Sequence, residues 1–272
     1  MGFQKGSITL SPTQDIPLLL QVLHSRFITH EQLLEFMMLG CYELKRNSFN
    51  WRVRRLVRSG LLNRHCVRPV TPSPVYSITN IAAFMLAEHC PILEMGNQRE
   101  AAELQFRIAH SIGLNDLHLS LMRQGVLQDW QSEVAIRATN ELTSSGYVKD
   151  YDAVVTVRVD GQSFKFALEY ERTAKKPKDY FRIRSLLEHE YRLRHFVYVV
   201  PDYKLASFIL ECFMGTTAAL VIGLANDFAR SFKDMSVTKC DAGLTVPITA
   251  ALRSPDEFAV TPPRLPRDSS LL

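Results

Sequence analysis

The most informative segment in the first part of this 272-residue chain is Phe49-Asn50-Trp51-Arg52-Val53-Arg54-Arg55-Leu56-Val57-Arg58-Ser59-Gly60-Leu61-Leu62. Its apolar residues recur at i, i+4, i+7 and i+8, namely Phe49, Val53, Leu56 and Val57. This spacing predicts a helix over residues 47–60 with one buried stripe, which Gly60 ends before Leu61 returns the chain to the core. The opposite face is predicted to be exposed, and it carries Ser48, Trp51, Arg55 and Arg58, flanked by Asn47, Arg52 and Arg54.

The surrounding sequence predicts a compact set of helices and a hairpin. A helix is expected over residues 15–24, and Thr29 with Gln32 forms a capping box that begins a second helix, which ends at Gly40. Two short strands, about residues 62–68 and 74–78, flank a proline-rich turn, and a helix over 81–89 follows. The predicted order is therefore three helices, a hairpin and a fourth helix.

Positive charge is concentrated in this part of the chain. Residues 1–90 hold ten Lys and Arg against five Asp and Glu, whereas residues 91–272 hold 22 against 23. From Lys45 to Arg68 there are eight basic residues and no acid. A local basic patch on a nearly neutral chain predicts a surface for a polyanion.

The order of elements and the stretch 49–62 resemble the recognition helix of bacterial winged-helix proteins, and Tyr76 to Thr79 resembles the strand that closes their wing. The resemblance implies that this part of the chain is a winged helix-turn-helix that binds double-stranded DNA, because the major groove of DNA admits an α-helix. The expected contacts are Asn47, Ser48, Trp51, Arg52, Arg54, Arg55, Arg58, Arg64 and Arg68. The alternative is a solvated basic helix in a protein–protein module. Trp51 either inserts at a groove or packs against the wing, and its large apolar area favours packing.

The second part of the chain predicts an α/β domain. Residues 98–124 form one long helix or two with a break near Gly113, and Glu133 to Ile136 is a short apolar alternation. Two strands, 151–159 and 163–171, are joined by Asp160-Gly161, a favourable hairpin turn. They are followed by a helix at about 177–192, a strand at 195–200, a helix at 203–213 and a strand at 219–224. The expected division is a DNA-binding domain over 1–92, an α/β domain over 93–252 and a disordered proline-rich tail over 253–272.

Carboxylates are expected to gather at one end of this hairpin. Strand alternation puts Glu169 and Glu171 on the same face, near Asp152 at the start of the neighbouring strand, and Glu133 could join them. Oxygen ligands of this kind suit Mg²⁺, which can support phosphoryl displacement. The alternative is a set of carboxylates at a solvated strand end, paired with arginines. His110 is interpreted as a hydrogen-bonded structural histidine.

This arrangement resembles a restriction-endonuclease-like core of the PD-(D/E)XK type. It departs from that motif at Tyr151, where the motif has Pro, and at Glu171, where it has Lys. The resemblance implies Asp152, Glu169 and Glu133 as metal ligands of an active enzyme. It also implies Asp152, Glu169 and Glu171 as catalytic residues, with Lys175 or Lys176 replacing the motif's lysine. A degenerate, non-catalytic domain is the favoured interpretation.

Over about residues 13–225 the chain most resembles the plasmid replication-relaxation family. The matching pieces, in order, are the winged helix, Ile108-Ala109-His110-Ser111-Ile112, Trp130-Gln131-Ser132-Glu133, Tyr151-Asp152-Ala153 and Phe166-Ala167-Leu168-Glu169-Tyr170-Glu171-Arg172-Thr173. The resemblance implies a regulator or accessory factor that acts on plasmids, phages or integrated elements in replication, relaxation or mobilisation.

Several classes of protein are disfavoured. No apolar run is long enough for a membrane span and no secretory signal is evident, so a cytoplasmic protein is expected. The five cysteines form no CxxC pair, which disfavours zinc sites and disulfide frameworks. No phosphate-binding glycine loop indicates a nucleotide cofactor, and no GxSxG motif indicates a serine hydrolase. A homodimer is one expected state, although no heptad pattern shows how it would form.

Overall fold

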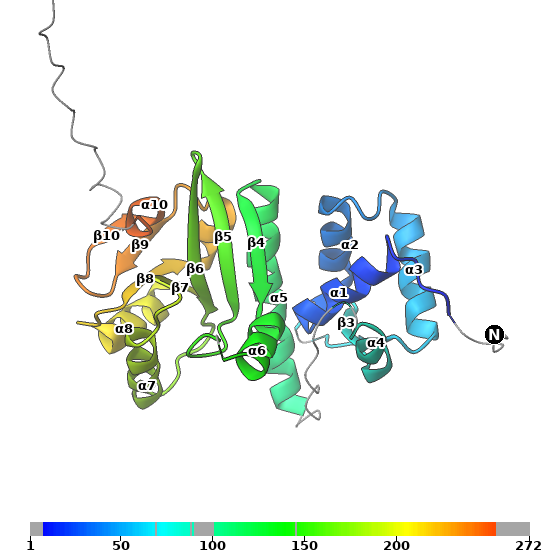
Figure 1. Ribbon diagram of the computed structural model, residues 1–272, viewed down its shortest axis with the longest axis horizontal. Coiled ribbons are helices and arrows are strands. Elements are labelled where there is room, and N and C mark those ends of the chain that lie inside the picture. The colour runs from blue at the N-terminus through cyan, green and yellow to red at the C-terminus, as the bar shows by residue number, and fades with distance from the viewer. Residues whose placement is uncertain (1–7, 69, 88, 90–100, 145, 254–272) are drawn as a thin grey trace, which may run out of the picture.

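The computed structural model describes residues 8–68, 70–87, 89, 101–144 and 146–253. It shows a mixed α/β fold, as predicted, with a three-stranded and a seven-stranded sheet among these residues. We call the part around the smaller sheet the N-terminal unit and the part around the larger sheet the sheet unit. Figure 1 shows them side by side along the longest axis, with the N-terminal unit in blue and cyan. The predicted boundary at 92–93 and the tail from 254 lie outside the described residues.

The N-terminal unit contains the predicted helices and hairpin. Its elements are α1 (Asp15–Ser25), β1 (Ile28–Thr29), α2 (His30–Leu39), α3 (Arg46–Arg58), β2 (Leu62–His65), β3 (Val75–Ile78) and α4 (Asn80–Met85). The strands pair antiparallel in the order β1-β3-β2. The short strand β1 precedes α2 directly, and sequence reasoning missed it because two residues show no periodicity.

Local sequence accounts for α2 and α3. The Thr29 side chain accepts from the Gln32 N–H, and the Gln32 side chain accepts from the Thr29 N–H, so the predicted capping box is present. In α3, Phe49, Val53 and Leu56 are buried, which confirms the predicted stripe. The chain leaves α3 through Gly60, whose φ of 70° lies in the left-handed region that favours glycine.

The sheet unit alternates helices and strands. Its elements are α5 (Ala101–Arg123), β4 (Leu127–Ser132), α6 (Glu133–Leu142), β5 (Ala153–Val159), β6 (Gln162–Tyr170), α7 (Pro177–Glu188), β7 (His195–Val200), α8 (Tyr203–Phe213), β8 (Ala219–Leu224), α9 (Ala225–Arg230), β9 (Ser236–Lys239), β10 (Thr245–Pro247) and α10 (Ile248–Ala251). The sheet order is β10-β9-β8-β7-β6-β5-β4. Neighbours β6, β7 and β8 are parallel, and the other neighbouring pairs are antiparallel.

The predicted hairpin is confirmed, since β5 and β6 pair on either side of Asp160 and Gly161. Both turn residues have positive φ, 50° and 81°, as a tight two-residue turn requires. The apolar alternation at residues 133–136 is not a strand. It is the first turn of α6, because the Ser132 side chain caps the helix by accepting from the Ala135 N–H.

Helix α5 is continuous through Gly113, where a break was one of two predictions. A Cβ on Gly113 would lie 2.3 Å from the Tyr170 ring, so the glycine lets α5 approach the end of β6. The same helix serves both units: Leu119 belongs to the core of the N-terminal unit, whereas Leu117 and Leu121 belong to a core of the sheet unit.

Polar contacts join the two units along α5. The Gln32 side chain donates to the Ile112 carbonyl (2.8 Å) and to the Asp116 carboxylate (2.7 Å). The Asn115 amide donates to the Phe27 carbonyl (2.9 Å).

Of the described helices, none combines the length and the apolar content that a membrane crossing requires.

Candidate functional site

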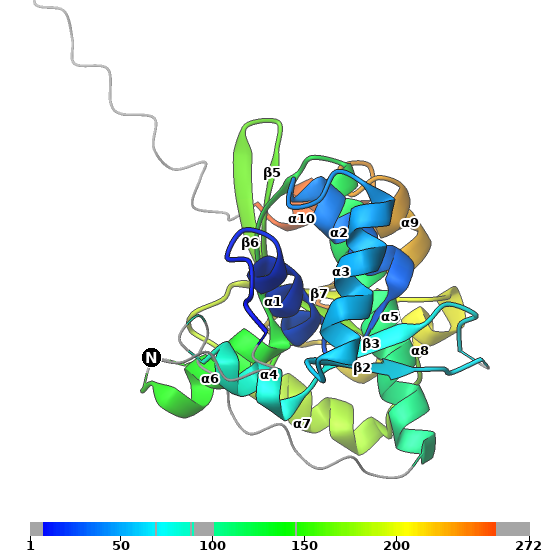
Figure 2. The ribbon, with the colours of Figure 1, turned by 90° about the vertical axis from the view of Figure 1, so that its right-hand side faces the viewer.

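The outer face of α3 is one candidate site. Its exposed residues follow the spacing of a single helical stripe, namely Asn47, Trp51, Arg54 and Arg58. Trp51 is 60% exposed, so the expected packing against the wing is wrong; its ring lies instead 5.3 Å from the Arg55 guanidinium carbon. In Figure 1, α3 lies at the end of the molecule farthest from the seven-stranded sheet, and Figure 2 shows it facing the viewer.

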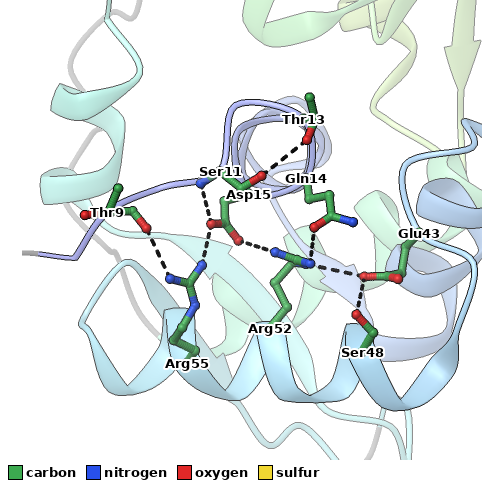
Figure 3. A network of polar contacts seen from close by, with 9 residues as sticks. All are labelled: Thr9, Ser11, Thr13, Gln14, Asp15, Glu43, Ser48, Arg52 and Arg55. Carbon is green, nitrogen blue, oxygen red and sulfur yellow. Dashed lines mark hydrogen bonds and ion pairs between the residues drawn. The ribbon is translucent and has the colours of Figure 1, made fainter.

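Arg52 does not lie on the exposed face, contrary to the prediction. It is 6% exposed and donates to the Asp15 carboxylate (2.9 Å) and, at 3.4 Å, to Glu43 (Figure 3). The physical reason is that Asp15 and Glu43 are themselves buried, and a buried carboxylate requires a charged partner. Arg52 thus ties α3 to the beginning of α1.

Two more of the expected DNA contacts turn toward this network. Arg55 donates to Asp15 and to the Thr9 carbonyl (3.2 Å), and Ser48 donates to Glu43 (3.1 Å), as Figure 3 shows. Burial works to raise the pKa of Asp15, but the bonds from Arg55, the Ser11 N–H and Arg52 outweigh it, so the pKa lies below its ordinary value. Asp15 therefore stays ionised and holds both arginines.

A groove of about 450 Å³ runs between α3 and the β2–β3 hairpin. Arg54 and Arg58 line it from α3, and Arg64 lines it from β2. Within the part of the chain that the structure describes, these three arginines have no ion-pair partner. Arg68, on the loop after β2, is exposed. The groove thus presents unneutralised positive charge from two elements.

The lining of this groove also contains three polar residues joined by hydrogen bonds, which sequence reasoning missed. The His30 ring bonds to the Tyr76 hydroxyl through Nδ1 (3.1 Å) and to the Asn50 side chain through Nε2 (2.9 Å). Burial raises the pKa of Tyr76, and Arg64 only partly opposes it, so the phenol stays neutral. No local pattern links these residues, because His30 and Tyr76 are 46 positions apart.

The predicted carboxylates do gather at the end of the β5–β6 hairpin. Asp152 precedes β5; it accepts from the Tyr170 N–H (2.7 Å) and lies 3.2 Å from His110 Nε2. Burial works to raise the pKa of Asp152, but His110 and the Tyr170 N–H outweigh it and lower the pKa. His110 is thus hydrogen-bonded, as the sequence predicts.

Two glutamates of the cluster, Glu169 and Glu171, have lysine partners. Glu169 pairs with Lys149, which sequence reasoning missed, and Glu171 pairs with Lys175. Burial raises the pKa of Glu169 to about 7 despite the Lys149 charge, and burial also raises that of Glu171. Lys176 is exposed at the beginning of α7.

Glu133 lies at a small cavity between the two units, of about 110 Å³, which His110 and Asp152 also line. It pairs with Arg26 of the N-terminal unit at 2.9 Å, and burial raises its pKa. Nearby, His24 Nδ1 bonds to the Ser132 hydroxyl at 2.8 Å. The cavity is therefore bounded by side chains from both units.

This arrangement does not fit the metal site that the endonuclease resemblance implies. Among the described residues, no three His, Cys, Asp or Glu side chains lie where they could hold a metal ion. The three expected ligands are each occupied by another partner: Asp152 by His110, Glu169 by Lys149, and Glu133 by Arg26. We therefore derive no metal-dependent step from this cluster.

Comparison with curated proteins and with solved structures found no match. The family model described as replication-relaxation matches residues 20–186. The match begins in α1 and ends in α7, so it includes α3, the hairpin groove and the carboxylate cluster. The chain belongs to the replication-relaxation family.

Proposed function

We propose that the N-terminal unit is a winged helix-turn-helix that binds a specific double-stranded DNA sequence. The single observation that supports it most is the row of arginines around the groove between α3 and the hairpin, Arg54, Arg58 and Arg64, which have no ion-pair partner among the described residues. Family membership supports a role in replication or relaxation of plasmid or other mobile-element DNA. The chain would act there as a regulator or accessory factor, including in mobilisation.

In this proposal α3 enters the major groove with its exposed stripe. Arg54 and Arg58 supply the parallel donors that guanine accepts, and Asn47 supplies an amide for adenine. Arg64 and Arg68, on and beside the hairpin, contact backbone phosphates. Arg52 and Arg55 act indirectly, because their bonds to Asp15 fix α3 on the body of the unit.

The proposal is tested by selecting bound sequences from a random duplex pool and measuring affinity for the selected site. We expect a defined site, and a log–log salt slope of roughly −4 to −5 if about five phosphates are neutralised. The double variant Arg54→Glu with Arg58→Glu should abolish this binding. A palindromic site would indicate that the chain binds as a dimer.

The matched control is Arg158→Glu with Lys165→Glu, two exposed positions on the β5–β6 hairpin of the sheet unit. This variant has the same change of net charge and should bind the selected duplex like the parent. An equal loss of duplex affinity in both double variants would mean that binding depends only on the net charge of the chain. Unchanged duplex affinity in a folded Arg54→Glu, Arg58→Glu protein would refute the proposal.

In the same proposal the carboxylate cluster is structural, since each of its carboxylates is paired with a basic group. A plasmid-nicking assay with Mg²⁺ or Mn²⁺ tests this. We expect no cleavage by the purified chain. Cleavage that disappears in Asp152→Ala would support a metal-dependent endonuclease instead.

A further inference from the structure

Helix α7 carries a second basic surface that the proposed duplex-binding site does not use. Residues 172–186 contain six Lys and Arg, at 172, 175, 176, 178, 182 and 184, against the single acid Asp179. The rest of the chain after residue 90 holds 16 Lys and Arg against 22 Asp and Glu, so this segment stands out from its surroundings. In Figure 1, α7 and α3 lie toward opposite ends of the long axis.

The geometry of α7 separates its basic residues into two groups. Tyr180 and Leu187 are buried, so this side of the helix packs on the sheet unit. Arg184 lies on the same inner side, where it donates to the Glu188 carboxylate and to the Met214 carbonyl. These bonds hold its side chain against the sheet unit. Lys178 and Arg182 are exposed and have no polar partner among the described residues.

An exposed aromatic residue, Phe181, lies between these two basic residues in the sequence. Phe181 is 58% exposed, and the helical period places it on the outer face with Lys178 and Arg182. Both features are unfavourable for an isolated protein. Like charges at i and i+4 repel each other, and an exposed phenyl ring keeps apolar area in water. Binding of a partner would offset both costs.

We propose that this outer face of α7, formed by Lys178, Phe181, Arg182 and Ser185, binds single-stranded nucleic acid. Positive side chains attract the phosphates, and an exposed ring offers a surface on which a base stacks. A duplex hides its base faces inside the helical stack, so the ring selects an unpaired strand. Lys176, exposed at the start of the helix, extends the positive charge toward the end of β6.

The test uses the full chain and a fluorescein-labelled oligothymidylate of about 12 nucleotides, within the usual footprint of such surfaces. Binding is measured by fluorescence anisotropy over a range of salt. We expect saturable, salt-sensitive binding that Phe181→Ala weakens by about 5- to 150-fold, because base–aromatic stacking has this magnitude. Phe181→Tyr keeps the ring and should keep the affinity.

Two control variants isolate the surface. Phe84→Ala removes a phenyl ring that is 84% exposed on α4, and it should leave oligothymidylate affinity unchanged. The double variant Lys178→Glu with Arg182→Glu should bind at least about tenfold more weakly and with a smaller salt slope. Arg158→Glu with Lys165→Glu, which changes net charge equally, should bind like the parent. Circular dichroism and melting curves confirm that each variant is folded.

The outcome is independent of the duplex proposal. Arg54→Glu with Arg58→Glu should lose the duplex and retain oligothymidylate, whereas the α7 variants should do the opposite. The inference is overturned if the folded chain does not bind oligothymidylate, or if Phe181→Ala and the α7 charge reversal both bind it like the parent. It is also overturned if unlabelled duplex of the same length competes as well as the single strand.

Discussion

At the scale of single residues, the buried pair of Asp15 and Arg52 shows how basic residues in one helix divide between structure and surface. Their side chains are 1% and 7% exposed, and Arg55 shares the same carboxylate. Removing the Asp15 charge leaves Arg52 with Glu43 alone as its ion-pair partner and leaves Arg55 without one among the described residues, and loss of a partner from a buried ion pair is strongly destabilising. We expect Asp15→Asn to lower the free energy of unfolding by about 3–5 kcal/mol, measured by urea denaturation.

The matched control for this change is Glu31→Gln. Glu31 pairs with Arg46 on the surface, where both side chains are 56% exposed, and solvent screens such a pair. The control should unfold at nearly the same urea concentration as the parent. If Asp15→Asn did the same, the buried network would not be what fixes α3 to α1.

Glu169 gives a pH-dependent expectation at the same scale. Because its pKa is raised to about 7, the folded chain holds a proton that the unfolded chain releases between about pH 4.5 and 7. Its contribution to stability is therefore present at low pH and lost as the pH rises through 7. Glu169→Gln removes this loss. We expect its melting temperature, relative to the parent, to rise between pH 5 and 8; a constant difference would contradict the assignment.

At the scale of helices and strands, the sequence predicted the features whose signals lie within a few neighbouring residues. The stripe of α3, the capping box of α2, the Asp160-Gly161 turn and the alternation that puts Glu169 and Glu171 on one face all depend on neighbouring residues. The inward turn of Arg52 was not predictable in this way. Its partner Asp15 is 37 positions away, and only packing of α1 on α3 brings them together.

Strand β4 and helix α6 were missed for a related reason. Residues 127–132 alternate poorly because β4 lies at the edge of the sheet and Gln128 and Asp129 are both exposed. The first turn of α6 looks like a strand over four residues, and only the Ser132 cap shows that a helix begins there. A segment this short does not distinguish the periodicity of a helix from that of a strand.

The capping box of α2 gives an expectation for one element. Thr29→Ala removes the oxygen that accepts from the Gln32 N–H, so we expect a loss of about 1 kcal/mol in the free energy of unfolding. Thr29→Ser retains an acceptor at the same place and should recover most of that stability. Equal losses in both variants would point to packing of the Thr29 methyl group as the cause.

At the scale of the whole molecule, α5 couples the two units. The helix makes polar contacts with Gln32 and Phe27 of the N-terminal unit, and its apolar side chains belong to the cores of both units. Both units therefore pack on the same helix. The His118 ring lies on α5, stacked 4.1 Å from the Trp130 ring of β4 and against Phe36 of α2. Burial lowers the pKa of His118 to about 3, so this aromatic contact carries no charge at neutral pH.

Such a shared helix should make the two units unfold together. We expect calorimetry of the full chain to show one transition, and Leu119→Ala, at a side chain that is 0% exposed, to move that whole transition down by roughly 5–15 °C. Leu244→Ala, at a residue that is 61% exposed, should leave it in place. The cavity that Leu119→Ala creates lies in the core of the N-terminal unit. If the stabilities of the two units were uncoupled, calorimetry would show two transitions, and only one of them would move. That result would show that α5 connects the units without coupling their stability.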